Sequence, residues 1–376
     1  MAPSPMLSFL RRCLVALPLL VPPVAAQQVL VVDIAGGPGS QFTQIGPAVQ
    51  AAEPGATILV RPGVYSNQIR ITKPVRIFGV PRQVVLRGTG DFTISGIGAG
   101  ESVLLRGIDE DYSQPFFYGI LARNCAGSIT CEDVDIEAMS FSSCASVALV
   151  HCDLALNLYV TASNATIVDC TANACCFLSV PQQAVVIQGG SHVTIAGGTY
   201  TSGDVTFPNS TVAVDASRLV VTGDRNTFLG LTPGSAGGSS ILMGNGAAVL
   251  LDPEPQLPNG WSGAGTVTQR VVPFLRAGVE NDTLHSTLVT WPNASTFLLV
   301  GALGAPIAVL PDTTPLWLPA PVVLASGPAP AAGVRIDTFP LPPLPLGTTV
   351  ALQSLAIRGP DAALSNATSA VLEFWP

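Results

Sequence analysis

Short runs of alternating apolar and polar residues follow one another along most of the chain, and no helical period separates them. The segment PGATILVRPGVYSNQIRITKPVRIFG contains three such runs, at Ala56–Val60, Gln68–Ile71 and Val75–Phe78. Glycine, proline or polar residues follow each run, as they do at tight corners. A period of two predicts strands with one buried side, so we expect short strands joined by tight corners.

One unit, apolar-x-apolar-x-(Gly, Asp or His), recurs through the first two thirds of the chain at intervals of about 18 to 28 residues. A single rung of a parallel β-helix has this length, and identical positions of successive rungs stack in its interior. The pattern predicts an all-β chain whose first domain is a right-handed parallel β-helix over residues 27–255. The units begin at Val75, Val103, Ile129, Val147, Ala165, Val193, Leu219 and Ala247.

The entry to this repeat carries a family resemblance. Gln44–Ala52 has the pattern of a short amphipathic helix, and it precedes a strand and a PGxY corner at Pro62, Gly63 and Tyr65. In this order the segment resembles the entry of pectin-lyase-like β-helix proteins, over about residues 29–255. The resemblance implies a helix that caps the apolar core. It leaves the activity open, because this fold hosts lyases, hydrolases, esterases and non-catalytic surface proteins.

After the repeat, the composition changes to the proline- and glycine-rich stretch DPEPQLPNGWSGAGT. We interpret residues 256–266 as a linker. Apolar strands separated by proline and glycine turns follow, and they predict a small antiparallel β-sandwich over residues 267–376.

The N-terminus predicts export. Arg11 and Arg12 precede a short apolar run interrupted by prolines, and small residues follow it, so residues 1–26 have the pattern of a secretory signal. Without these arginines, the 16 basic and 24 acidic residues give a net charge of roughly −10. We therefore expect a secreted or cell-surface protein with no membrane span in the mature chain, and no nucleic-acid partner.

Aspartates recur at one corner of the predicted coil. Asp109, Asp135 and Asp153 occupy the seventh position of successive repeat units, and His151 occupies the fifth. Stacked carboxylates about 4.8 Å apart repel one another unless solvent, a proton or a cation compensates. Calcium binds several oxygen ligands, so these three residues are our candidate calcium site; a purely structural role at the corners is the alternative.

Catalytic candidates are few. Segments typical of pectin methylesterases and polygalacturonases of this fold are absent from the sequence. Pectate lyases of the pectin-lyase-like family use an acidic calcium cluster with an arginine base. The resemblance implies that this base would be Arg106 or Arg123. His151, between acidic neighbours, is a candidate acid or base.

Cys152 and Cys170 occupy the same repeat position one rung apart. Their expected Cα separation of about 4.8 Å suits a disulfide, and a reduced internal pair is the alternative.

The sequence favours an exported, non-catalytic β-helix protein that binds an extended polysaccharide. A calcium-dependent polysaccharide lyase acting on uronic-acid polymers is the alternative. Calcium is the one cofactor that these patterns suggest.

Overall fold

The computed structural model describes residues 27–371, except residues 67, 88–91, 112–118, 176–182, 204–209, 231–238, 254, 256, 281, 311–313 and 342–347. The predicted signal segment lies outside the described residues. Within the described ranges, the structure has no helix with the length and apolar character that a membrane crossing requires.

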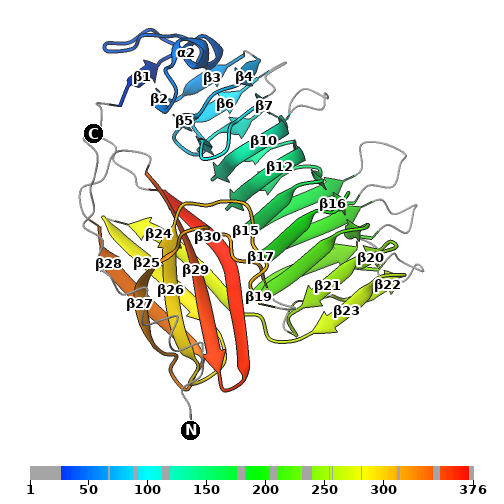
Figure 1. Ribbon diagram of the computed structural model, residues 1–376. Helices are drawn as coiled ribbons and strands as arrows, with labels where there is room; N and C mark the ends of the chain where they lie inside the picture. Colours follow the sequence, from blue (N-terminus) through cyan, green and yellow to red (C-terminus); the bar gives the residue numbers. More distant parts are fainter. Residues whose placement is uncertain are drawn as a thin grey trace.

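A curled parallel sheet of 23 strands forms the first domain, and its rungs stack along one axis (Figure 1). The strand pairings form three ladders, which we call the first, second and third faces of the coil. The predicted parallel β-helix is confirmed by this pairing.

Each face takes one strand, or one part of a long strand, from most of the rungs. The first face contains β1 (Val29–Val32), β2 (Ala56–Val60), β5 (Val75–Phe78), β8 (Ser102–Arg106), the later parts of β10 (Gly119–Glu132) and β12 (Ala138–Val150), the first parts of β15 (Asn164–Cys175), β17 (His192–Gly203) and β19 (Arg218–Gly230), and β21 (Ala248–Leu251) and β23 (Thr266–Gln269). The second face contains β3 (Gly63–Tyr65), β6 (Val84–Leu86), β9 (Asp109–Glu110), β11 (Asp135–Ile136), β13 (Asp153–Leu154) and the later parts of β15, β17 and β19. The third face contains β4 (Ile69–Ile71), β7 (Phe92–Ser95), the first parts of β10 and β12, and β14 (Leu158–Thr161), β16 (Val185–Gln188), β18 (Val212–Val214), β20 (Ile241–Met243) and β22 (Trp261–Gly263).

The predicted repeat register holds in the middle of the coil. Val103, Ile129, Val147 and Ala165 pair in succession and are buried in one apolar core. At the C-terminal end, however, Leu219 pairs with Val249 and not with Ala247 as predicted. Alternate residues all point inward there, so a shift of two residues preserves the apolar pattern that the prediction used.

The ends of the coil also differ in part from expectation. Helix α2 (Ile45–Ala51) contributes Ile45, Ala48 and Val49 to the apolar core, as expected of a cap. At the other end, β22 and β23 still pair with β20 and β21, so the parallel sheet runs through the predicted linker to Gln269. Few apolar residues mark this last rung, which explains the boundary placed at residue 255.

Two antiparallel sheets form the second domain. One contains β24 (Phe274–Glu280), β25 (Thr283–Val289) and β28 (Val334–Pro340), and the other contains β27 (Val322–Pro328), β26 (Ser295–Gly301), β29 (Thr349–Arg358) and β30 (Asp361–Val371). Leu275 and Leu288 of the first sheet pack with Leu298 and Leu352 of the second in one core, which gives a β-sandwich. The predicted second domain is therefore an antiparallel sandwich beginning at Phe274.

The sandwich packs against the first face of the β-helix (Figure 1). Phe274 of β24 is buried against Val150, Val168 and Ala196, whose side chains point outward from the coil. The hydroxyl of Thr166 donates to the carbonyl of Ala367 in β30 at 2.8 Å. Outward positions that would be polar on an open β-helix are therefore apolar or hydrogen-bonded on this face.

Candidate functional site

The predicted corner residues lie where the first face turns into the second. Gly107, Asp133, His151, Asp169 and Gly197 occupy one stack and all have positive φ, between 49° and 79°. Glycine adopts this left-handed conformation freely, and aspartate and histidine adopt it more readily than most residues. The corner backbone therefore explains why the fifth repeat position is Gly, Asp or His.

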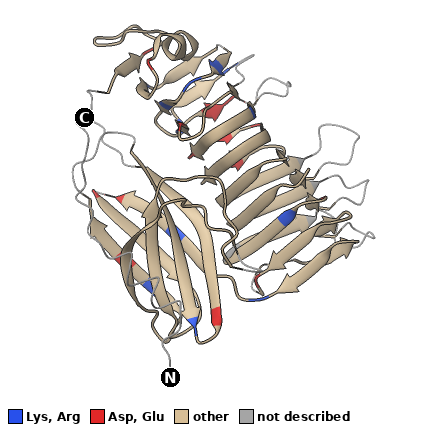
Figure 2. Ribbon diagram, viewed as in Figure 1, with Lys and Arg blue, Asp and Glu red and all other residues tan. Residues whose placement is uncertain are grey.

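The predicted aspartate column is present. Asp135 pairs with both Asp109 and Asp153, and Thr171 continues the column by donating its hydroxyl to Asp153 at 2.6 Å. Exposure rises along the stack, from 8% for Asp109 to an exposed Asp153. Figure 2 shows acidic residues on neighbouring rungs in this part of the coil.

Burial changes the chemistry of the first aspartate. Desolvation, reinforced by the charge of Asp135, raises the pKa of Asp109 from 3.8 to about 6. No hydrogen bond from the described residues reaches its buried Oδ2. A proton on this carboxyl relieves the repulsion that the sequence predicted for the column.

The column does not form a metal centre in the described ranges. Across them, no three carboxylate, imidazole or thiol groups converge closely enough to hold a metal ion. One carboxylate per rung, on one flat ladder, spaces the ligands along the axis and does not wrap them around a point. The candidate calcium set Asp109, Asp135 and Asp153 is thus stacked as predicted but lacks the geometry of a calcium site.

The catalytic candidates separate into two places. Arg106 lies 3.3 Å from Asp133 and 3.6 Å from Glu132, and the imidazole of His151 lies 3.7 Å from Asp133. Arg123 pairs with Ser95 and Ser142 on the third face, beyond a different corner of the rung. The structure therefore brings Arg106 and His151 to one carboxylate and leaves Arg123 apart from them.

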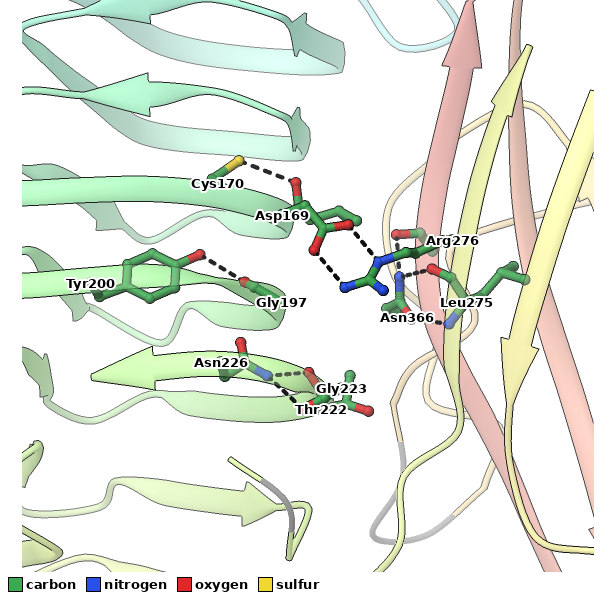
Figure 3. Close-up of polar contacts among 12 residues, drawn as sticks. Asp169, Cys170, Gly197, Tyr200, Thr222, Gly223, Asn226, Leu275, Arg276 and Asn366 are labelled. Atoms are coloured by element: carbon green, nitrogen blue, oxygen red, sulfur yellow. Dashed lines mark hydrogen bonds and ion pairs between the residues drawn. The ribbon is translucent and has the colours of Figure 1, made fainter. Parts of the chain in front are cut away.

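Asp169, the last acidic residue of the corner stack, lies at the interface with the sandwich and forms an ion pair there. Arg276 of β24 donates to its two carboxylate oxygens at 2.7 and 2.9 Å (Figure 3). Next to Arg276, the side chain of Asn366 in β30 accepts a hydrogen bond from the amide of Leu275 and donates one to its carbonyl, both at 2.8 Å. This end of the corner is therefore occupied by an ion pair between the domains.

Cys152 and Cys170 are stacked on adjacent rungs, but both are free thiols. The amide of Cys152 donates to the sulfur of Cys170 at 3.3 Å, and the thiol of Cys170 donates to the carbonyl of Val168 at 3.3 Å. Burial raises the pKa of the Cys152 thiol well above its ordinary value. Of the two alternatives that the sequence left open, the structure has Cys152 and Cys170 as a reduced internal pair and not as a disulfide.

The third face carries a surface that the sequence analysis missed. Tyr159, Val186, Ala213 and Leu242 pair in succession and point outward, and Tyr159 and Leu242 are 40% and 42% exposed. We call this stack the apolar ladder. β16, β20 and β22 lie on the side of the coil away from the sandwich, so the sandwich does not cover this face (Figure 1).

A second stack runs beside the apolar ladder, two residues further along each strand. Arg123, Ser142, Thr161 and Gln188 pair in succession, and the Gln188 amide donates to the Thr161 hydroxyl at 3.1 Å. The exposed Asp215 comes directly after the next strand, β18, which ends at Val214. We call this stack the polar ladder, and Arg123 is its member at the N-terminal end.

The two ladders border a shallow depression of about 370 Å³. Its walls include Val186, Ala213 and Leu242 on one side and Gln188, Asp215 and Gly244 on the other. The sequence signal for it was an apolar residue in the middle of each third strand, as in NLYVT, AVVIQ and SILMG. These strands are only three or four residues long, so no single one of them shows the alignment.

The sequence matches no described protein family and no curated protein. Among solved structures, the chain is similar to a pectin methylesterase mutant in complex with a hexasaccharide, with 13% identity and a TM-score of 0.36 over 67% of this chain and 83% of that one. It is also similar to the tailspike protein gp49 of Acinetobacter baumannii bacteriophage Fri1, a capsular polysaccharide depolymerase, with 8% identity and a TM-score of 0.30 over 94% of this chain and 81% of that one. Scores this low carry no argument, and the fold is established by the strand pairing itself.

Proposed function

We propose that this chain is an exported β-helix protein that binds an extended polysaccharide along its third face without cleaving it. The observation that carries the proposal is the apolar ladder running beside the polar ladder over consecutive rungs. A sugar ring presents apolar C–H faces and hydroxyl edges, and these match an apolar stripe beside hydrogen-bonding side chains. A long chain laid along the coil axis repeats the same contacts on each rung.

The electrostatics of the corner support a binding role over catalysis. A lyase base must be available to the proton that it removes, and Arg106 is engaged by Asp133 and Glu132. Arg123 belongs to the polar ladder, away from the aspartate column. A calcium-dependent lyase would need groups that the described structure keeps apart.

Affinity electrophoresis against neutral and uronic-acid polysaccharides, with and without calcium, tests this function. The proposal predicts calcium-independent retardation by at least one polysaccharide and no ultraviolet absorbance from an unsaturated sugar product. Such absorbance, appearing only with calcium, would replace the proposal with the lyase. Absence of retardation across the panel would count against polysaccharide binding itself.

A further inference from the structure

The outer strands of the two sandwich sheets differ in what lies beside them. β24 and β30 lie on the side that packs against the β-helix, where Phe274 of β24 is buried on the coil. β27 and β28 lie on the side away from the β-helix (Figure 1). The sandwich therefore has two strand edges that the β-helix does not cover.

The edge of β28 carries features that discourage the addition of another strand. Arg335 and Asp337 on this strand form an ion pair at 2.9 Å, and the guanidinium of Arg335 points inward to the hydroxyl of Thr296 on the other sheet. The strand ends at Pro340, which has no amide hydrogen. Inward-pointing charges and proline are devices that keep an edge strand from pairing.

The edge of β27 lacks both features. Residues 322–327 read VVLASG, without a charged residue or a proline. Within the described ranges, β27 pairs with β26 and with no further strand, so one side of its backbone has no strand partner. A bulge at Leu324 interrupts the ladder with β26, so a new pairing along this edge is short. An apolar edge of this kind is a template for another strand.

Apolar side chains project into solvent along the same strand. Val322, Val323 and Leu324 are 64%, 49% and 37% exposed. Val322 and Val323 are neighbours in the strand and point to opposite faces of the sheet. A strand laid beside β27 would therefore cover apolar surface on both faces while it pairs with the backbone.

The partner that this edge fits is a second copy of the chain. Two identical edge strands related by a two-fold axis pair antiparallel and complement each other, so no other sequence is needed. The mature chain has a net charge of roughly −10, so two copies repel each other least where charge is missing. The β27 edge is such a neutral contact.

We propose that the protein forms a weak two-fold dimer in which β27 of each copy pairs antiparallel with β27 of the other. The contact joins the two four-stranded sheets into one sheet across the dimer. A short strand edge and its apolar side chains bury on the order of 1,000 Å² in total, at the lower limit for a specific interface, which makes the dimer weak. The third face lies on the far side of each coil, so the contact covers neither of them.

Sedimentation equilibrium of the full chain, without polysaccharide, tests the dimer. We expect a monomer–dimer equilibrium in the micromolar range, and a chain that stays monomeric at high micromolar concentration overturns the proposal. Hydrogen exchange read by mass spectrometry tests the strand pairing itself. Amides of residues 322–327 should exchange more slowly at high than at low protein concentration. Dimerisation without this protection overturns the pairing through β27.

Two variants and one matched control locate the contact. Val322→Lys and Val323→Lys place like charges on the edge and should each weaken dimerisation tenfold or more. Ile336→Lys adds the same charge on the neighbouring β28. Arg335 and Phe339 of that strand point to the other sheet, so Ile336, which is 69% exposed, points away from it. This control should leave the dimer unchanged. Unchanged dimerisation in both β27 variants, or an equal loss in Ile336→Lys, overturns the proposed contact.

Discussion

Arg276 of the sandwich holds both carboxylate oxygens of Asp169 in the β-helix, at 2.7 and 2.9 Å. The two side chains are 27% and 21% exposed, and Arg276 also lies 4.6 Å from the centroid of the Phe274 ring. Phe274 in turn fills an apolar cluster on the outward side of the coil. One ion pair and one aromatic ring thus fix the sandwich against the first face.

We predict that Asp169→Asn lowers the free energy of unfolding by about 2 kcal/mol, because it removes one charge from a bidentate, partly buried pair. Asparagine tolerates the positive φ of 49° at this position, so the backbone need not change. Thermal and denaturant unfolding measure the loss. Arg358 and Asp361 form an exposed ion pair of 4.0 Å within the sandwich, so Asp361→Asn should cost less than about 0.5 kcal/mol. Equal effects of the two substitutions would contradict this account.

A second prediction concerns pH and Asp109. Its pKa rises from 3.8 to about 6 on folding, so the folded chain binds more protons than the unfolded chain between these values. The contribution of Asp109 to stability is therefore fully present below about pH 4 and is lost as the pH rises through about 6. The loss is on the order of 3 kcal/mol. Asp109→Asn removes this loss.

Unfolding of the wild type and Asp109→Asn at several pH values checks the sign. The variant should be the more stable protein at pH 7, and the difference should shrink towards pH 4. Asp153→Asn, at the exposed end of the column, is the matched control and should show little change. A stability difference for Asp109→Asn that stays constant from pH 4 to pH 7 would show that Asp109 does not titrate in this way.

The cysteines give a third prediction. Because Cys152 and Cys170 are free and buried, neither should react with iodoacetamide in the folded protein. Both should be alkylated after unfolding without a reductant, as peptide mapping by mass spectrometry would report. Recovery of a linked peptide containing both residues would restore the disulfide interpretation.

The sequence predicted the repeat because each rung obeys local rules. Val103, Ile129 and Val147 alternate with outward residues, and left-handed corners select Gly, Asp or His, so the stack was visible from spacing alone. Asp109, Asp135 and Asp153 were placed correctly by the same register. The repeat register did not predict how deeply each of these aspartates is buried.

What the sequence could not predict depends on contacts between distant segments. Asp169 and Arg276 are separated by 107 residues, and no local pattern links them. The outward positions of Val150 and Val168 are apolar because the sandwich covers them. The apolar ladder was hidden because Tyr159, Val186 and Leu242 lie on strands of only three or four residues, too short to be aligned one by one.

A fourth prediction concerns this ladder. Tyr159→Ser and Leu242→Ser each remove an exposed apolar contact and should weaken polysaccharide binding by up to about tenfold, the equivalent of about 1.4 kcal/mol. Affinity electrophoresis against the polysaccharide that retards the wild type measures the change. Ile336→Ser is the matched control, since Ile336 is 69% exposed on β28 of the sandwich. A loss of affinity in the control as large as in the ladder variants would place binding elsewhere.

The most direct measurement of the central claim is a crystal structure of the full chain with an oligosaccharide from the retarding polysaccharide. We expect electron density for the sugar along the third face, with a ring against Tyr159 or Leu242 and a hydroxyl within hydrogen-bonding distance of Gln188. Density confined to the corner beside Asp135, with the third face empty, would contradict the account.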